Sequence, residues 1–427
     1  MVFELNNSPP TDTYDEDISK IFYQECFPVS NRLGTSFTST VQYSFSNVGN
    51  TFWIPNQSYC EMRLKLCLRT QSGTNLPLNP GSGIYPAYNL PAMPWSSFQH
   101  QMANTTIDAT YQYAQTDTVN KRKYYTKSVK ESWGTVLFLD SDPVTRLYNS
   151  SYSSSGLNAG YLSTTVLFRP SAGLFATDAY VPGSASHQLF LQVDPNWKTK
   201  VIESVNRSCT PGTDYDVEVE DLRFLAAMCN VDDQPVNNGS HYISFSASET
   251  SLVNCNNTTN NIYFNIKPST NKISVFLQNA NSGVDTQFSC ANFNPSGIAN
   301  MLSFVPRSQL AGNIQPITDI QLYSNSGVMF YQYQRAYLDY VQSCNYTVSD
   351  VGNETFDAWM YKQGPIFCYR FPKGNSLGGA AQLVETINFI STFKPDNINA
   401  WVFSEYNRVL KLDYVNGELN SVVVEDL

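Results

Sequence analysis

Charge is scarce in this sequence, and so is histidine. Of the 427 residues, 15% are Asp, Glu, Lys or Arg, where soluble domains average about 25%, and only three are His. The low charge does not indicate disorder, because 42% of the residues are hydrophobic and 14% are aromatic, which offsets the entropy lost on folding. No window approaches about 18 consecutive apolar residues, which excludes a transmembrane helix. The composition predicts a folded protein of net charge −10.

Motifs for catalysis are missing as well. The sequence contains no phosphate-binding G-x-x-x-x-G-K-[ST], no G-x-S-x-G nucleophile motif and no H-E-x-x-H zinc motif. His100, His187 and His241 lack the spacing of metal ligands, so we expect each of them to be structural or on the surface. The sequence therefore predicts a protein that is not an enzyme, with no catalytic, cofactor-binding or metal-binding residues.

The N-terminus and the cysteines indicate a reducing compartment. Residues 1–5 lack the basic start and the apolar run of a secretion signal. The nine cysteines are odd in number, form no C-x-x-C pair, and in places such as Cys67 and Cys229 lie inside apolar runs. We expect synthesis in the cytosol of a host or expression cell, reduced thiols and no disulfide scaffold.

One segment near the N-terminus has helical spacing. Ile18, Ile21, Phe22 and Cys26 recur at i, i+3, i+4 and i+8, and acidic residues precede them at 15–17. The pattern predicts a short helix that docks its apolar face on the body of the protein, in preference to one that binds a membrane.

From about residue 35 the hydrophobic period changes to two, which is typical of half-buried strands. We predict strands at Val41–Ser46, Tyr59–Arg69, Gly134–Leu139, Tyr161–Phe168, Gln188–Val193, Tyr215–Met228, His241–Ser246, Ile262–Ile266, Lys272–Gln278, Ile317–Tyr323, Pro365–Phe371, Leu383–Phe393 and Ala400–Leu412. Near the C-terminus, Asn416-Gly417 separates two alternating runs and predicts a two-residue hairpin turn.

A polar stretch at 230–240 divides this β pattern into halves of similar length. Each half has roughly eight strands, which fits an all-β chain of two consecutive eight-stranded antiparallel jelly rolls with long loops between strands. The expected domains are an N-terminal arm with the short helix at 1–34, a first jelly roll at 35–232 and a second at 233–427.

Two clusters of charged residues are candidate sites. Asp216, Glu218 and Glu220 alternate along a strand, and we expect them to form its solvated face in preference to a calcium or substrate site. The basic residues Lys121, Arg122, Lys123, Lys127 and Lys130 surround Tyr124 and Tyr125. We expect this basic cluster to be a solvated or subunit-contacting patch, because the acidic total disfavours the alternative, which is nucleic-acid binding.

The ordered series of strands resembles a known family. The segments that carry the resemblance are Tyr59–Leu66, Pro94–Phe98, Thr106–Asp108, Leu174–Gly183 with Leu189–Leu191, Tyr215–Leu225, Lys272–Gln278 with Phe288 and Phe293, Asp319–Leu322 with Gly327, and Trp401–Leu412. In order and spacing they are similar to the double jelly-roll major capsid proteins of Polintons, adintoviruses, virophages, larger DNA viruses and tailless phages. The resemblance covers about residues 35–425.

The resemblance implies a structural protein of an icosahedral DNA-virus capsid. Three chains would place six jelly rolls around a threefold axis, which gives a pseudo-hexagonal capsomer. The implied partners are copies of this chain, penton and minor capsid proteins, and a host receptor reached through surface loops; direct sequence-specific binding of nucleic acid is not expected. The implied location is the virion. The alternative is a carbohydrate-binding or glycoside-hydrolysing jelly-roll protein that uses carboxylates such as Asp216 or Glu218.

Overall fold

The fold is known from a computed structural model. It describes residues 18–29, 37–152, 154–158, 160–205, 207–231, 238–255, 259–267, 269–293, 319–324, 327–331, 333–344, 354–356, 358–370, 383–390 and 398–426.

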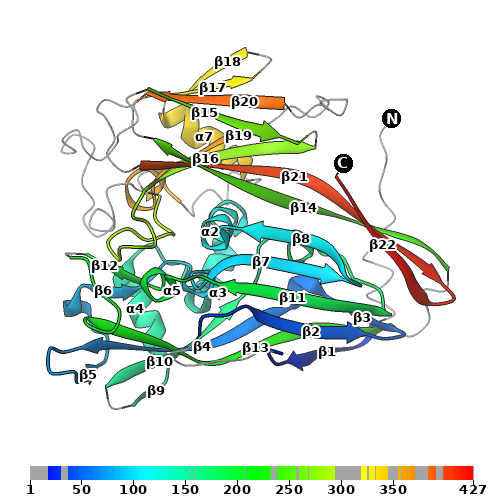
Figure 1. The fold of residues 1–427 in the computed structure, drawn as a ribbon, viewed down its shortest axis with the longest axis horizontal. Coiled ribbons are helices and arrows are strands. Elements are labelled where there is room, and N and C mark those ends of the chain that lie inside the picture. The colour runs from blue at the N-terminus through cyan, green and yellow to red at the C-terminus, as the bar shows by residue number, and fades with distance from the viewer. Residues whose placement is uncertain are drawn as a thin grey trace.

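Eight strands of the N-terminal half form two antiparallel sheets that face each other (Figure 1). In chain order they are β1 (Ile18–Cys26), β2 (Val41–Asn47), β4 (Tyr59–Arg69), β7 (Trp95–Met102), β8 (Thr105–Tyr111), β10 (Tyr161–Phe168), β11 (Ala185–Val193) and β13 (Tyr215–Val231). One sheet has the order β1-β13-β4-β10 and the other the order β2-β11-β7-β8. The first, eighth, third and sixth strands thus face the second, seventh, fourth and fifth, which is the connectivity of a jelly roll.

The C-terminal half repeats this connectivity. Its strands are β14 (Asn238–Cys255), β15 (Thr259–Ile266), β16 (Thr270–Asn279), β17 (Asp319–Ser324), β18 (Gly327–Tyr331), β19 (Ile366–Arg370), β20 (Leu383–Ile390) and β21 (Ile398–Val415). The sheets have the orders β14-β21-β16-β19 and β15-β20-β17-β18. The expected fold, two consecutive eight-stranded antiparallel jelly rolls, is confirmed.

Shorter elements decorate the rolls. The remaining strands are β3 (Thr51–Trp53), β5 (Asn75–Leu76), β6 (Ile84–Pro86), β9 (Ser154–Asn158), β12 (Ile202–Ser204) and β22 (Glu418–Asp426). The α-helices are α2 (Tyr113–Tyr124), α3 (Lys127–Leu137), α4 (Pro143–Tyr152), α5 (Trp197–Lys200) and α7 (Tyr333–Ser343). Single turns are η1 (Pro55–Gln57), η2 (Pro80–Ser82), η3 (Leu90–Ala92), η4 (Gly173–Ala176) and the π-helical η7 (Ala358–Lys362). In the described part of the chain, no helix has the length and apolarity to cross a membrane.

Alternating apolar residues build the core of the first roll. In β4, Cys60, Met62, Leu64 and Leu66 are buried, while the residues between them are half-buried. The same hydrophobic core contains Phe245 and Leu410, which belong to strands of the second roll. Because burial of one large apolar side chain contributes roughly 1.5–3 kcal/mol, a core that extends across both rolls joins them into one block.

The expected N-terminal helix is wrong. Residues Ile18–Cys26 form β1, which pairs with β13 so that Cys26 lies opposite Phe224. Cys26 is buried while Ile21 and Tyr23 are about half exposed, so the true period of the segment is two. The local spacing fits either period over so short a run, and the pairing with a strand about two hundred residues away decided the outcome.

The strand predicted at Gly134–Leu139 is also wrong, because its first residues belong to helix α3. The hydroxyl of Thr126 caps this helix by accepting a hydrogen bond from the backbone N–H of Val129, at 3.3 Å. Phe138 then ends it in the left-handed conformation. The other predicted strands coincide with or overlap strands of the structure.

The predicted hairpin is confirmed. Val415 of β21 pairs with Glu418 of β22, which leaves a loop of two residues. Asn416 and Gly417 both have positive φ, 54° and 81°, as a type I′ turn requires.

Candidate functional site: the seam between the two rolls

Helix α2 lies between the two rolls and contributes to the cores of both (Figure 1). Tyr113 and Ala114 pack in the core of the first roll, and Val119 packs in the core of the second. Three consecutive cations follow: Lys121, Arg122 and Lys123 are at most 1% exposed. Consecutive residues of a helix point about 100° apart, so the three side chains leave α2 in three directions. We call α2 and the groups that bind these cations the seam.

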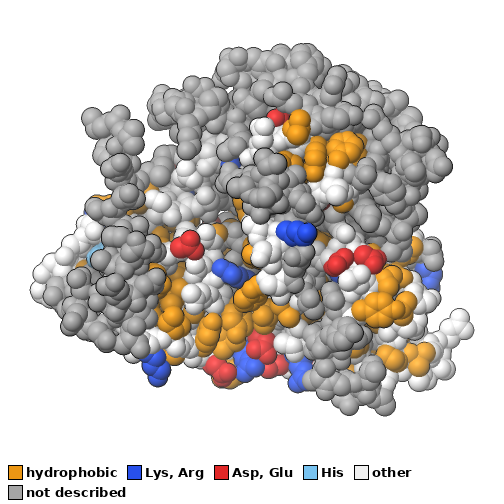
Figure 2. Space-filling model, turned by 180° about the vertical axis from the view of Figure 1, so that it is seen from behind, with side chains coloured by type: hydrophobic (Ala, Val, Ile, Leu, Met, Phe, Trp, Pro, Cys, Tyr) orange, Lys and Arg blue, Asp and Glu red, His pale blue; other side chains and the backbone are white. Residues whose placement is uncertain are grey.

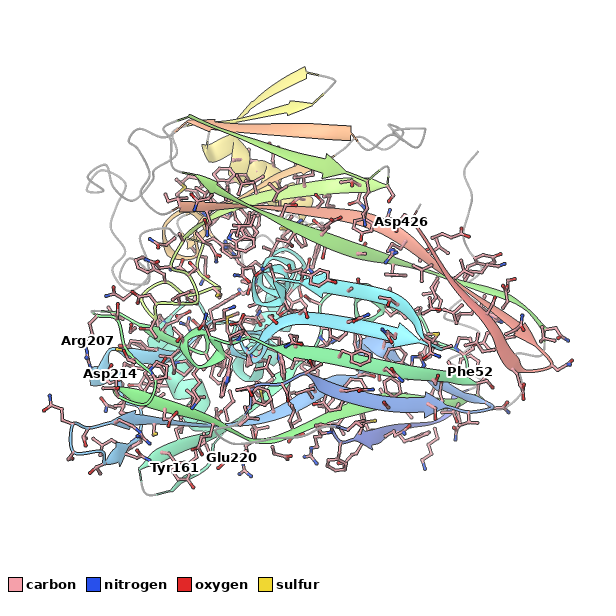
Figure 3. The ribbon with its side chains drawn as sticks, viewed as in Figure 1. Phe52, Tyr161, Arg207, Asp214, Glu220 and Asp426 are labelled. Carbon is pink, nitrogen blue, oxygen red and sulfur yellow. The ribbon has the colours of Figure 1, made fainter. Side chains whose placement is uncertain are left out.

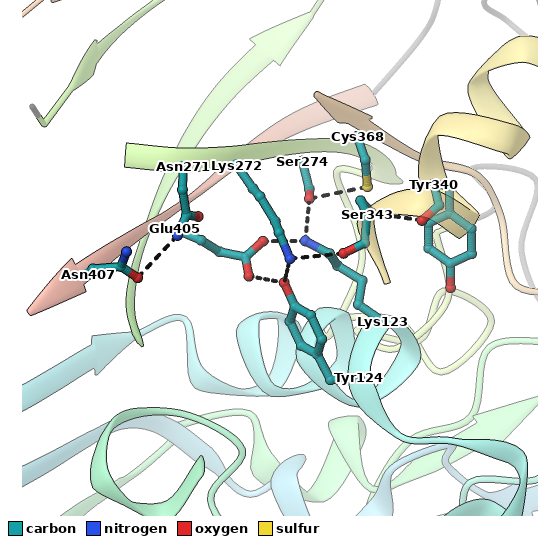
Figure 4. Close-up of polar contacts among 10 residues, drawn as sticks. All are labelled: Lys123, Tyr124, Asn271, Lys272, Ser274, Tyr340, Ser343, Cys368, Glu405 and Asn407. Atoms are coloured by element: carbon teal, nitrogen blue, oxygen red, sulfur yellow. Dashed lines mark hydrogen bonds and ion pairs between the residues drawn. The ribbon is translucent and has the colours of Figure 1, made fainter. Parts of the chain in front are cut away.

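Lys123 reaches two strands of the second roll (Figure 4). Its ammonium donates to the hydroxyl of Ser274 on β16, at 3.0 Å, and to the carboxylate of Glu405 on β21. The hydroxyl of Tyr124 donates to the same carboxylate and accepts a hydrogen bond from Lys272, at 3.1 Å. Burial alone would lower the pKa of Lys123, but Glu405 and Tyr124 outweigh it and raise that pKa well above its ordinary value.

Arg122 binds the segment that precedes β19. Its guanidinium pairs with the carboxylate of Glu354 at 2.6 Å and donates to the backbone carbonyl of Gly364 at 2.9 Å. The hydroxyl of Tyr340, on α7, donates to the other oxygen of Glu354 at 2.6 Å. Each charge is therefore buried with a partner and with additional hydrogen bonds, which is the condition under which buried ion pairs are tolerated.

Lys121 turns back to the first roll. Its ammonium lies 2.7 Å from the carboxylate of Asp117 and 2.9 Å from the side-chain oxygen of Asn89. Burial lowers the pKa of Lys121 in spite of the adjacent Asp117. Since α2 is anchored to the first roll by Lys121 and to the second by Arg122 and Lys123, the seam fixes the position of one roll on the other.

The expectation of a solvated or subunit-contacting basic patch is wrong for Lys121, Arg122 and Lys123, and for these three residues the nucleic-acid alternative is wrong as well. Of the five predicted cations, Lys127 is exposed and Lys130 is half-buried. Buried, paired cations cannot reach a phosphate. Sequence reasoning missed the seam because Glu354 and Glu405 follow their partners by 232 and 282 residues.

The acidic row on β13 is placed as predicted, on one partly exposed face, but its charges are neutralised. Asp216 lies 2.7 Å from Lys198, Glu218 lies 3.8 Å from Lys65, and Glu220 lies 3.5 Å from Arg63. Within the described ranges, no group of three or more His, Cys, Asp or Glu side chains is arranged to hold a metal ion. The geometry therefore makes a cross-strand ion-pair ladder, which needs no cation.

Replacing Asp216, Glu218 and Glu220 by their amides will have a small effect. Partly exposed ion pairs contribute about 0–1 kcal/mol each, so the triple variant should lose at most about 3 kcal/mol of unfolding free energy in a urea titration. Millimolar Ca²⁺ should leave the melting temperature of the unmodified protein unchanged. A calcium-dependent rise that the triple variant lacks would show that the row is a metal site.

Two of the three histidines form a buried pair, and the third lies on a strand of the second roll. His100 and His187 are fully buried in the first roll, with their ring nitrogens 3.2 Å apart. His187 also contacts the side-chain oxygen of Asn47 at 3.2 Å, and its ring stacks on Phe45. Burial lowers the pKa of His100 to about 3, and burial together with His100 lowers the pKa of His187 well below its usual value. His241 lies on β14, where its ring contacts the ring of Tyr414 edge to face.

The eight cysteines whose side chains the structure describes are free and buried. Burial raises the pKa of Cys26 and of Cys229 to about 11, so little reactive thiolate forms near neutrality. We expect the folded protein to resist iodoacetamide at pH 8 and the urea-unfolded protein to be alkylated at every cysteine, as read by intact mass. Rapid native labelling at Cys229 would contradict the buried placement.

The segments that carried the family resemblance lie in the strands of both rolls. Asp108 of β8 is buried beneath Gly173, where a Cβ atom would approach its carboxylate to 2.7 Å. Gly173 also has a φ of +63°. Glycine is therefore favoured at this position twice, because it avoids a clash with Asp108 and because it adopts a positive φ without strain. Arg408 of β21 donates to the backbone carbonyl of Ile107 at 3.1 Å, which adds another contact between the rolls.

Two eight-stranded jelly rolls in one chain define the double jelly-roll fold. Among solved structures, the chain is similar to one from the Sputnik virophage, with 11% identity, a TM-score of 0.62, and coverage of 96% of this chain and 89% of that one. It is also similar to the mavirus major capsid protein, with 10% identity, a TM-score of 0.56, and coverage of 95% and 90%. A chain of the PBCV-1 virus capsid matches with 10% identity, a TM-score of 0.57, and coverage of 94% and 96%.

These likenesses extend over nearly the whole length of each chain and show that the fold is shared. No protein-family model matches the sequence, and no curated protein matches it either.

Proposed function

We propose that this chain is the major capsid protein of an icosahedral DNA virus or virus-like element, and that it acts as a homotrimer. The observation that carries the proposal is the pair of jelly rolls locked together by a buried seam. Three copies of a fixed pair of rolls place six similar rolls around one threefold axis, so the trimer has an approximately hexagonal outline. A rigid block of this kind can tile a shell.

The surface supports a role in permanent contacts. Apolar side chains are exposed along and after β1, where Ile21 and Tyr23 are about half exposed and Phe27 and Val29 more so. Figure 2 shows hydrophobic side chains in patches on one face, some of them bordered by charged side chains, and only 15% of the residues of the chain are charged. Depletion of charge with enrichment of aromatic residues is typical of the centres of protein interfaces. We propose that β1 contributes to contacts between copies.

We further propose that the two rolls are the domains of the chain, with β1 counted in the first roll, which ends with β13, and with the second roll beginning at β14. Penton and minor capsid proteins, and a receptor contacted through surface loops, are the proposed partners. The virion is the proposed location. The carbohydrate alternative receives no support from Asp216 and Glu218, because both are ion-paired to lysines.

Light scattering coupled to size-exclusion chromatography tests this proposal. The expected mass is three times the 47.9 kDa of one chain, and negative-stain images should show pseudo-hexagonal particles. A stable monomer that binds or cleaves glycans would contradict it.

A further inference from the structure

A cleft of about 890 Å³ lies where the two rolls meet, beside the seam. Its first wall comes from the first roll, where Tyr125, Arg169 and Phe175 contribute side chains. Its second wall is a row across three paired strands of the second roll. Ser248 on β14 lies opposite Glu405 on β21, which lies opposite Lys272 on β16.

Several polar groups of this cleft lack a hydrogen-bond partner among the residues that the structure describes. The hydroxyl of Ser248 is without a hydrogen bond although the residue is only 7% exposed. The side-chain oxygens of Asn56 and Asn271 are buried and have no donor. Buried polar atoms are almost always paired, so three orphans lining one cleft indicate a ligand that supplies donors.

Arg169 adds a positive charge to the same place. Within the part of the chain that the structure describes, its guanidinium makes no hydrogen bond and no ion pair, while the neighbouring Lys272 is bonded to Tyr124 and to the carbonyl of Ser343. A guanidinium binds carboxylates with two parallel hydrogen bonds. The guanidinium of Arg169 can therefore bind a carboxylate, and the three unpaired side-chain oxygens can accept hydrogen bonds from N–H or O–H groups of a ligand.

We propose that this cleft binds an extended peptide segment with an acidic side chain, supplied by a protein other than a second copy of this chain. A peptide brings backbone N–H donors for Asn56 and Asn271 and a carboxylate for Arg169. Asp178 and Glu405 also line the cleft, so a backbone with a negative charge on every unit is repelled more strongly than a peptide with a single carboxylate placed at Arg169. The carboxylates of the acidic row on β13 are already paired with cations of their own chain, so they are not available to bind in the cleft of a neighbouring copy.

Fluorescence anisotropy with two labelled hexapeptides tests this proposal. One peptide is Ser-Gly-Asp-Val-Ser-Gly, the other has Asn in place of Asp, and both have an amidated C-terminus, so that the Asp side chain is the only carboxylate in the pair. We expect the acidic peptide to bind the full chain at least tenfold more tightly. Arg169→Gln should abolish that preference, Arg169→Lys should retain part of it, and Ser248→Ala should weaken both peptides a few-fold. The matched control is Arg207→Gln, which changes an exposed arginine outside the cleft and should leave binding unchanged.

Melting curves of each variant establish that the fold is intact, and Arg169→Lys and Ser248→Ala remain informative if Arg169→Gln unfolds. The proposal is overturned if neither peptide binds, if both bind equally, or if Arg169→Gln leaves the preference intact. A single-stranded oligonucleotide that binds more tightly than the acidic peptide and depends on Arg169 would also overturn it. So would loss of self-association in the Arg169→Gln protein, since the occupant would then be a second copy.

Discussion

Replacing Lys123 by Met will cost about 3–5 kcal/mol of unfolding free energy, because it leaves the Glu405 carboxylate buried without its cation. Lys123 is fully buried and Glu405 nearly so, and the pair joins α2 to β21. Urea titrations monitored by tryptophan fluorescence measure the change. The melting temperature should fall in parallel.

Two controls separate this effect from the loss of an ordinary ion pair. Arg207 and Asp214 lie side by side at the periphery of the first roll, 2.8 Å apart, with Arg207 67% exposed (Figure 3). Removing that pair should cost about 0–1 kcal/mol. The double variant Lys123→Met/Glu405→Leu removes both buried charges and should recover much of the lost stability. A single Lys123 variant as mild as the surface control would show that the seam does not hold the rolls together.

Acid will destabilise the folded chain through His100 and His187. Both have pKa values depressed by burial, His100 to about 3, whereas a histidine in the unfolded chain has a pKa of about 6.5. Below that pH the unfolded state takes up protons that the folded state does not bind. Each histidine therefore lowers the unfolding free energy by about 1.4 kcal/mol per pH unit as the pH falls from 6.5 towards 3.

Asp108 acts in the opposite direction. Burial raises its pKa to about 6, so its folded carboxyl gains a proton before the unfolded one does and stabilises the fold as the pH falls from 6 to about 4. Between pH 6 and about 4, the stabilisation from Asp108 cancels the destabilisation from about one of the two histidines, so the unfolding free energy still falls with decreasing pH.

Urea titrations at pH 6, 5 and 4 test the assignment to particular residues. His187→Gln should flatten the dependence of unfolding free energy on pH by about 1.4 kcal/mol per unit, and Asp108→Asn should steepen it by a similar amount. His241 is only half-buried, so His241→Gln should change the slope less. An unchanged slope in the His187 variant would refute the explanation.

Much of the fold could be predicted from local patterns. The bounds of β4 and β10 match the predicted strands. The turn at Asn416-Gly417 could be predicted because both of its residues tolerate positive φ. The strand pattern of the two halves was compatible with two jelly rolls, but only the family resemblance supported that connectivity over other β-sandwiches, since alternation identifies strands and not their partners.

The site could not be predicted in the same way. A run of lysine and arginine ordinarily indicates a solvated face, because burial of three unpaired cations would be prohibitive. Their partners Glu354 and Glu405 lie in the second half of the chain and carry no local signal. The prediction of a helix at Ile18–Cys26 was wrong for a related reason, since the pairing of this segment with β13 is a long-range contact.

The seam also has a consequence for synthesis on the ribosome. Glu405 emerges 282 residues after Lys123, which at about 5–20 residues per second is a delay of roughly 15–60 s. Arg122 lacks its carboxylate partner until Glu354 emerges, and Lys123 lacks its own until Glu405 emerges at the end of this interval. A prematurely terminated chain would keep them unpaired, so it could complete neither the seam nor the block. Only full-length translation products would then be competent to enter an assembly.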